Sequence, residues 1–223
     1  MIHLIPALKM SYPGEGTFTL DTPEMLLGEM GYTCIIGKNG SGKSSFGEAL
    51  SIQGHAAGDK KWHYLPQYLE RFLFAENLVD QLNNLLSQEI DRPCLKELLQ
   101  EMGFSDPEGM LEFPFLLLSG GERRRMALAC VFYIKPKFLI LDEPEIGVTT
   151  KENMVLLSKI NNLQAINGRI VVISHNYEFV KASTDLICLR NGRLGRFGAT
   201  QALLSDSDFN IKDYGVRFEA INR

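Results

Sequence analysis

The strongest structural signal in the chain is residues 37–45, which read Gly-Lys-Asn-Gly-Ser-Gly-Lys-Ser-Ser and follow the apolar run Cys34–Ile36. Closely spaced glycines allow consecutive backbone N–H groups to turn inward around an anion. The helical stretch Phe46–Leu50 comes next, so the glycines are expected to form a turn between a strand and a helix. A helix beginning near Lys43 would direct the positive end of its dipole toward the same anion. The segment therefore predicts a loop that binds phosphate groups.

The side chains of this loop extend the expected phosphate contacts. Lys43 would place a positive charge near the β- and γ-phosphates, and Ser44 would offer its hydroxyl to Mg²⁺. The alternative interpretation is an ordinary glycine turn, but the strand before the loop and the helix after it favour phosphate binding. The predicted nucleotide-contacting residues of the loop are Gly37, Asn39, Gly40, Ser41, Gly42, Lys43, Ser44 and Ser45.

Length and composition indicate a single large domain. The chain has 223 residues, with Lys+Arg 23 against Asp+Glu 27, and this mildly acidic balance gives no reason to expect nucleic acid as a partner. No apolar run approaches the roughly 20 residues that span a bilayer, and no signal peptide is recognisable, so we expect a soluble cytoplasmic protein. The cysteines lack paired-ligand spacing, which predicts buried thiols in a reducing compartment rather than a zinc site.

Apolar runs typical of strands recur along the chain, with helical patterns between the later ones. These runs are Ile2–Leu8, Thr17–Leu20, Thr33–Ile36, His63–Leu65, Phe138–Leu141, Arg169–Ile173 and Leu186–Arg190. The alternation predicts an α/β fold with a mostly parallel core sheet and an N-terminal antiparallel β layer. Residues 68–118 instead have leucines at helical spacing, so we expect an inserted α-helical subdomain there. Residues 1–67 and 119–223 would then form the core of one domain.

A second glycine motif, Leu118–Glu122, precedes the helical run Arg123–Phe132. Ser119 is expected to cap this helix, and the N–H groups after it would face an anion. Taken alone, the motif fits a loop and a helix cap equally well. Its position is informative, because soon afterwards an apolar strand ends in two carboxylates, Asp142 and Glu143.

Together these motifs closely resemble the ATP-binding cassette (ABC) ATPase family of P-loop NTPases, over almost the whole chain. The family signature Leu-Ser-Gly-Gly-Gln is matched except at Glu122. The resemblance implies that two cassettes meet head to tail, and that Ser119, Gly120 and Gly121 contact the γ-phosphate of ATP in the opposite subunit. Glu122 would then place a negative charge beside that triphosphate. ATP hydrolysis is expected, at a rate that this charge would influence.

The resemblance also assigns roles to residues elsewhere in the chain. Asp142 would hold Mg²⁺ through water, and Glu143 would polarise the attacking water. Gln67 matches the glutamine of the family's Q-loop, which joins the metal and the water to the helical insertion. His175 follows an apolar strand and matches the family's switch histidine, which contacts the γ-phosphate. The predicted catalytic residues are thus Lys43, Gln67, Glu143 and His175, and the predicted metal-binding residues are Ser44, Gln67 and Asp142.

Two further positions near these motifs have competing interpretations. Tyr12, upstream of the phosphate loop, matches the family's aromatic residue that stacks on adenine; a tyrosine packed before a turn is the alternative. The basic run Arg123–Arg125 could indicate a nucleic-acid patch, but consecutive helical positions point in different directions. We therefore expect these arginines to form the solvated, partner-facing start of the signature helix.

The chain departs from the family pattern after Pro144. The family usually reads Thr-Ser/Ala-Gly-Leu-Asp there, in a segment called the D-loop, whereas this chain has Glu145–Thr149. Thr149 replaces the aspartate, which could weaken coupling between two cassettes or mark one member of an unequal pair. Residues 67–78 look like the Q-loop region of the energy-coupling factor and cobalt-type importer ATPases. Phe72–Phe74 and Leu78 would then help to form a groove for a membrane subunit, unless they only pack the helical insertion.

We therefore expect an ATPase subunit of an ABC transporter, peripheral on the inner face of the cell membrane. It would use ATP and Mg²⁺, dimerise with a second cassette, and drive a separate integral membrane subunit, more in the manner of an importer than of an exporter. One alternative is a soluble ABC ATPase that clamps a nucleic acid or ribosome, and another is a weakly active regulatory cassette. The transported compound is not indicated, because specificity would lie in other subunits.

Overall fold

The structure is a computed structural model that describes residues 3–12, 18–27, 31–56, 62–69, 72–147, 149–165 and 169–218. The strands are β1 (His3–Ile5), β2 (Leu8–Tyr12), β3 (Phe18–Thr22), β4 (Met25–Leu27), β5 (Thr33–Ile36), β6 (Trp62–Leu65), β7 (Phe138–Asp142), β8 (Arg169–Ile173), β9 (Asp185–Arg190) and β10 (Arg193–Ala199). The helices are α1 (Lys43–Ala56), α2 (Leu78–Leu85), α3 (Arg92–Glu101), α4 (Pro107–Met110), α5 (Gly120–Ile134), α6 (Thr150–Ala165), α7 (Tyr177–Ala182) and α8 (Thr200–Ser205). Two 3-10 turns are η2 (Phe115–Leu117) and η3 (Ile211–Tyr214). No helix among these residues combines the length and apolar character that crossing a bilayer requires.

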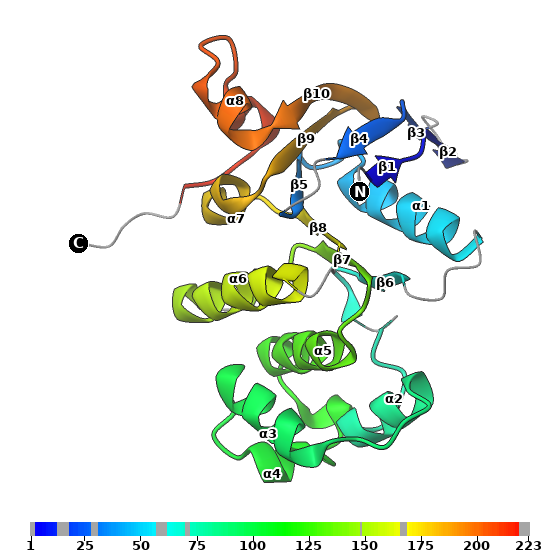
Figure 1. The fold of residues 1–223 in the computed structure, drawn as a ribbon, viewed down its shortest axis with the longest axis vertical. Helices are drawn as coiled ribbons and strands as arrows, with labels where there is room; N and C mark the ends of the chain where they lie inside the picture. Colours follow the sequence, from blue (N-terminus) through cyan, green and yellow to red (C-terminus); the bar gives the residue numbers. More distant parts are fainter. Residues whose placement is uncertain are drawn as a thin grey trace.

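The centre of the main sheet is parallel, with the strand order β9-β5-β8-β7-β6 (Figure 1). Every residue of β5 is buried, and β7 and β8 are buried after their first residue, as expected for parallel strands covered on both faces. The predicted runs Thr33–Ile36 and Arg169–Ile173 are confirmed as strands. Because parallel strands end at the same edge of a sheet, the segments that follow β5, β7 and β8 meet there.

Antiparallel pairs form among the N-terminal strands and also between β9 and β10. β2 pairs with β3, and β3 joins the main sheet through a single register pair, Asp21 with Arg193 of β10. β1 and β4 form a separate two-stranded sheet. The prediction of one strand over Ile2–Leu8 is wrong, because Pro6, which has no N–H to donate, separates β1 from β2. Residues 2 and 17 of the predicted runs lie outside the described residues.

Helices pack on both faces of the sheet. On one face, Phe46 and Leu50 of α1 lie in an apolar cluster with Ile140 and the N-terminal strands. On the other face, a second cluster joins α5, α6 and α7 to the helices of residues 72–118. A Cβ on Gly47 of α1 would lie 2.9 Å from Cδ1 of Ile173, so the helix approaches the sheet closely. This contact fixes the position of the loop that precedes α1.

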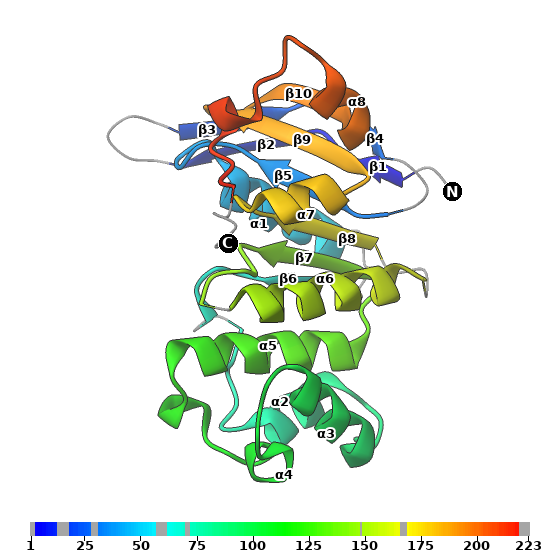
Figure 2. The same ribbon diagram turned by 90° about the vertical axis from the view of Figure 1, so that its left-hand side faces the viewer.

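The segment between β6 and α5 is helical, and residues 72–118 contain no strand. Its helices lie beyond α5, at the end of the molecule opposite β9 and β10 (Figures 1 and 2). Leu78, Leu82 and Leu95 are fully buried, which confirms the helical spacing predicted from the leucines. The burial of Leu78 fits the alternative that it packs the helical insertion rather than a groove, whereas Phe74 is 61% exposed.

Candidate functional site

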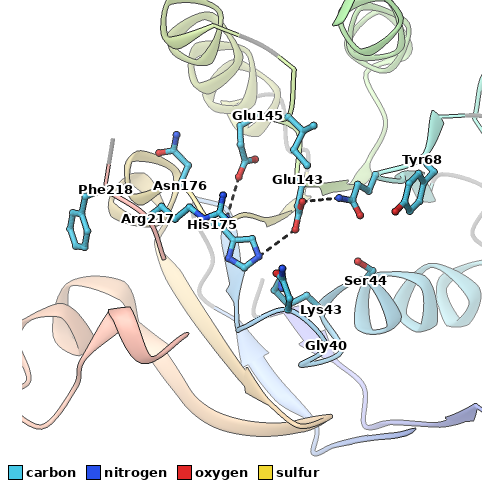
Figure 3. Close-up of a pocket in the computed structure, with 13 residues that line it drawn as sticks. Gly40, Lys43, Ser44, Tyr68, Glu143, Glu145, His175, Asn176, Arg217 and Phe218 are labelled. Carbon is cyan, nitrogen blue, oxygen red and sulfur yellow. Dashed lines mark hydrogen bonds and ion pairs between the residues drawn. The ribbon is translucent and has the colours of Figure 1, made fainter. Parts of the chain in front are cut away.

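A pocket of about 760 Å³ lies at the edge of the sheet where the parallel strands end (Figure 3). Its walls come from the loop after β5 and from segments that follow β6, β7, β8 and η3. Among the residues predicted from sequence, those that line it are Asn39, Gly40, Lys43, Ser44, Gln67, Glu143 and His175. Motifs far apart in the chain are therefore brought together around one cavity.

The loop between β5 and α1 depends on glycine for its shape. Gly40 and Gly42 have φ angles of 77° and 99°, which L-residues with a Cβ rarely adopt. A Cβ on Gly42 would also lie 2.6 Å from Cζ of Phe18. The loop closes on itself through the Ser41 N–H, which donates to the Lys38 carbonyl at 3.0 Å. These features give a compact anion cradle at the N-terminus of a helix.

Lys43 begins α1, and its side chain folds back into this loop. Its Nζ donates to the Gly37 carbonyl at 2.8 Å, and the residue is only 6% exposed. Burial lowers the pKa of this ammonium, while the carboxylates of Glu143 and Asp142 act in the opposite direction. A triphosphate would offer the partly desolvated ammonium a stronger counter-charge than a carbonyl oxygen does.

Asp142 ends β7 and is 1% exposed. The Tyr64 hydroxyl donates to Oδ2 at 3.0 Å, whereas Oδ1 has no hydrogen-bond partner among the described residues. Burial raises the pKa of this carboxyl, and the hydroxyls of Ser44 and Tyr64 lower it. An unpartnered, buried carboxylate oxygen beside a hydroxyl suits a hard divalent cation, which prefers oxygen ligands. The residues present therefore fit Mg²⁺.

Glu143 lies between two of the other predicted residues (Figure 3). Gln67 Nε2 donates to its Oε2 at 3.0 Å, and His175 Nε2 lies 3.3 Å from its Oε1. The contact with His175 is the main influence that lowers the pKa of Glu143, against the opposing effect of burial. The carboxylate is thereby kept ionised, as a group that accepts a proton from water must be.

His175 is held at its other ring nitrogen by the segment that follows η3. Its Nδ1 lies 3.0 Å from the carbonyl oxygen of Gly215, so this nitrogen carries the hydrogen. In the neutral ring Nε2 then has a lone pair, whereas in the imidazolium it carries a proton that faces Glu143. The imidazole can therefore donate from Nε2 only when it is positively charged.

Arg124 corrects the prediction that Arg123–Arg125 are solvated. Arg124 is 3% exposed, and its guanidinium reaches into the site from α5. It donates to four backbone carbonyls, those of Pro66 (2.8 Å), Gln67 (3.4 Å), Asp142 (2.6 Å) and Glu143 (2.7 Å). Arg125 instead pairs with Glu152 at 3.0 Å. Neighbouring positions on a helix do point in different directions, but one of these directions leads to the backbone of Asp142 and Glu143.

The second glycine motif lies at the start of α5, as predicted. Ser119 caps the helix: its Oγ accepts from the Glu122 N–H at 3.3 Å, and Glu122 Oε2 accepts from the Ser119 N–H at 2.9 Å. Hydrogen bonds from the side chain and the backbone of Ser119 to the carboxylate lower the pKa of Glu122. A Cβ on Gly121 would lie 2.9 Å from the Gly147 carbonyl. None of the described residues that line the pocket comes from residues 119–122.

Some residues of the pocket were not predicted from sequence. They include Tyr68, Glu145, Ile146, Asn176, Arg217 and Phe218. Arg217 and Phe218 belong to a tail without a recognisable motif, and the backbone N–H of Arg217 donates to the His175 carbonyl at 2.7 Å. Glu145 was noted only as a departure from the family pattern. The side chain of Tyr12 lies outside the described residues, so its predicted contact with adenine stays a prediction.

The fold and the site define a P-loop ATPase of the ABC class. Residues 20–145 match the family model described as ABC transporter, which is more than half of the chain. The chain therefore belongs to the ABC transporter family, as one of its ATP-binding, ATP-hydrolysing subunits.

Individual relatives agree with this assignment. The cobalt import ATP-binding protein CbiO of Rhodobacter capsulatus is 30% identical over 226 residues, covering 90% of this chain and 79% of that protein. The energy-coupling factor transporter ATP-binding protein EcfA3 of Oenococcus oeni is 28% identical over 210 residues, covering 82% and 72%. A solved dimeric bacterial ABC transporter cassette matches with a TM-score of 0.73 at 18% identity, covering 90% and 99%. These comparisons confirm the predicted fold class and the predicted resemblance to cobalt and energy-coupling factor ATPases.

Proposed function

We propose that this chain hydrolyses Mg²⁺-bound ATP in the pocket described above, with Glu143 as the residue that activates water. The observation that carries the proposal is the arrangement of Glu143, whose carboxylate is held by Gln67 and His175 beside the phosphate loop. Because the segments that carry Gln67 and His175 both contact this carboxylate, its position is fixed before nucleotide binds. Such preorganisation is what a general base requires.

The chemistry follows from these positions. Water attacks the γ-phosphorus, its proton passes to Glu143, and the bond between the γ-phosphorus and the bridging oxygen breaks, which leaves ADP and inorganic phosphate. Lys43 stabilises charge on the β- and γ-phosphates. His175 contacts the γ-phosphate through Nε2 while Gly215 keeps the ring oriented. Gln67 orients the carboxylate that takes the proton.

Mg²⁺ would be held by the Ser44 hydroxyl and the Asp142 carboxylate, with Gln67 nearby. The unpartnered Oδ1 of Asp142 supports this assignment. When bound, the ion neutralises phosphate charge and polarises the transferred phosphoryl group.

A second cassette completes the site. The signature residues Ser119, Gly120 and Gly121 do not line the pocket of their own chain, and the N–H groups of Gly120 and Gly121 at the start of α5 are suited to an anion that belongs to a partner. We propose that ATP closes a two-cassette sandwich, either a homodimer or a heterodimer, and that hydrolysis reopens it. The domain organisation predicted from sequence, with residues 68–118 as a helical insertion, would let this closure move the insertion.

The motion would be passed to an integral membrane subunit, with the chain peripheral on the cytoplasmic face of the membrane. Relatives named for cobalt import and energy-coupling factor transport favour an importer of a metal ion or vitamin. Affinity capture of the tagged chain from detergent-solubilised membranes of its host would test this. Recovery of an integral membrane protein supports the proposal, whereas recovery of only nucleic-acid-bound proteins would favour the clamp alternative.

The catalytic assignment is tested by Glu143→Gln, Lys43→Ala and the control Glu178→Gln, an exposed carboxylate on α7. Glu143→Gln should lower kcat by about 100-fold or more and leave ATP affinity within a few-fold, because general-base catalysis is lost while the phosphate loop is intact. Lys43→Ala should weaken nucleotide binding, and chelation of Mg²⁺ should abolish turnover. Undiminished turnover by purified Glu143→Gln would refute the assignment.

A further inference from the structure

Glu145 links the segment after β7 to the segment after β8. It lies two residues beyond Glu143, and its Oε1 accepts two hydrogen bonds, from Ser174 Oγ at 2.5 Å and from the His175 N–H at 3.1 Å. Ser174 Oγ in turn accepts from the Asn176 N–H at 2.9 Å. A single carboxylate oxygen thereby organises the whole backbone turn that carries His175 (Figure 3).

Burial makes the position of the Glu145 carboxyl group unfavourable unless its hydrogen bonds to Ser174 and His175 are formed. Ser174 is fully buried, and burial raises the pKa of the Glu145 carboxyl. Oε2 has no hydrogen-bond partner among the described residues. Placing a carboxyl group in an enclosed position is unfavourable unless donors compensate, and here the donors are those of the His175 turn.

His175 is consequently held from two sides. The Gly215 carbonyl fixes its ring at Nδ1, and Glu145 fixes its backbone at N. Together these contacts leave Nε2 directed at Glu143, 3.3 Å from Oε1. Removal of one of them would allow the imidazole to move away from the carboxylate it contacts.

We propose that Glu145 is a positioning residue for ATP hydrolysis, which acts by fixing the backbone of His175 opposite Glu143. It makes the turn after β7 and the His175 turn move as one unit. The inference rests on the proposed function, because it requires His175 to act at the γ-phosphate.

Substitutions at Glu145 test whether its hydrogen bonds, rather than its charge, position His175. In Glu145→Ala the Ser174 hydroxyl and the His175 N–H lose their acceptor, so kcat should fall about tenfold while the KM for ATP changes by less than about threefold. In Glu145→Gln the amide oxygen can accept both hydrogen bonds, so kcat should return to within about threefold of the wild-type value. The control Glu178→Gln, in the helix that follows His175, removes a charge without altering these contacts.

The decisive comparison repeats Glu145→Ala in a His175→Ala background. If Glu145 acts through His175, the second substitution should lower kcat by less than about twofold beyond His175→Ala alone. An equal tenfold loss in both backgrounds would overturn the proposal, as would wild-type kcat in Glu145→Ala or in His175→Ala.

The position of His175 can also be measured without ATP turnover, and therefore independently of the proposed function. NMR spectra of protein labelled at its 4 histidines, with the His175 signal assigned from His175→Ala, should show that signal displaced in Glu145→Ala and restored in Glu145→Gln. An unchanged His175 signal in Glu145→Ala would overturn the positioning role. A displaced signal in a protein whose wild type neither binds nor hydrolyses ATP would show that Glu145 positions His175 and would refute the proposed function, and with it the part in ATP hydrolysis.

Discussion

At the residue scale, Glu143 combines a chemical role with an uncommon backbone conformation. Its φ angle is 48°, in the left-handed region that costs an L-residue with a Cβ about 1–2 kcal/mol. The carbonyls on both sides of this conformation, those of Asp142 and Glu143, accept hydrogen bonds from Arg124. The helix that begins with the signature motif therefore helps to hold Glu143, the proposed general base, in place.

Arg124→Gln should lower the free energy of unfolding by about 2–4 kcal/mol, because a shorter amide cannot reach the four carbonyls that accept from Arg124 and leaves buried acceptors unpaired. The same variant should lower kcat, since the turn at Glu143 loses its support. Denaturant unfolding and ATPase assays measure both effects. Arg123→Gln, one position earlier on the helix, is the matched control, with an expected change of about 0.5 kcal/mol or less. Equal effects at the two positions would contradict the role given to Arg124.

Glu122→Gln should reveal a pH-dependent helix cap. Hydrogen bonds from Ser119 lower the pKa of Glu122, so the contribution of its charged form is present above the ordinary pKa and is lost as pH falls through the lowered value. Glutamine supports the same capping geometry without titrating. The melting temperature of the variant relative to the wild type should therefore rise as pH is lowered from about 7 to about 4. A difference that stays constant with pH would argue against the capping role of the charge.

At the element scale, the parallel strands of the core were predictable and β10 was not. β5 and β8 are continuous apolar runs because both of their faces are buried, so composition alone marks them. β10 is mostly exposed and contains Gly195 and Gly198, so nothing in its sequence distinguishes it from a loop. It becomes a strand by pairing with β9, which is a tertiary effect.

The segment after η3 is the element whose contribution sequence analysis missed entirely. Gly215 has a φ angle of 77°, and a Cβ there would lie 3.3 Å from Cα of Lys38 and 3.5 Å from Cε1 of His175. The residue therefore packs between the phosphate loop and the imidazole, where its carbonyl holds Nδ1. No local pattern could have indicated a partner 40 positions away.

Gly215→Ala should consequently cost about 1–2 kcal/mol of stability and lower kcat several-fold, because the backbone must leave the left-handed region and draw its carbonyl away from His175. Gly198→Ala is the control: a Cβ at that position would lie 3.9 Å from its nearest neighbour, Cγ of Leu203. Thermal unfolding and steady-state ATPase kinetics distinguish the two variants. Wild-type kcat in a folded Gly215→Ala protein would show that the carbonyl does not position the ring.

At the scale of the whole molecule, the catalytic motifs separate into two groups. The phosphate loop, Glu143 and His175 surround one pocket, whereas residues 119–122 lie at the start of α5 outside it. The short motifs could be located from sequence because each is contiguous. The hydrogen bonds by which Arg124, Glu145 and Gly215 hold these motifs could not be located from sequence, because they join segments that only the folded chain brings together.

This separation predicts complementation between two inactive variants. Ser119→Asp keeps a good helix cap but places a negative charge toward the partner's triphosphate, and Lys43→Ala disables the phosphate loop. If cassettes pair with each other, an equimolar mixture should recover up to about a quarter of wild-type ATPase activity, because half of the dimers contain one intact composite site out of two. Activity of the mixture no greater than that of either variant alone would argue against sites shared between cassettes.

The two-stranded ribbon of β2 and β3 should open locally more easily than the rest of the sheet, because a single register pair joins β3 to β10. β5 is joined to its neighbours by seven register pairs, whereas β2 and β3 reach the main sheet only through Asp21 and Arg193 within the described residues. Because so few register pairs join this ribbon to the sheet, its amide hydrogens should exchange with solvent sooner than those of β5 and β8, even though Leu8 and Leu20 pack in the apolar core. Tyr12 ends β2, so a nucleotide base stacked there would slow this exchange. The ribbon would then report on nucleotide occupancy through its rate of local unfolding.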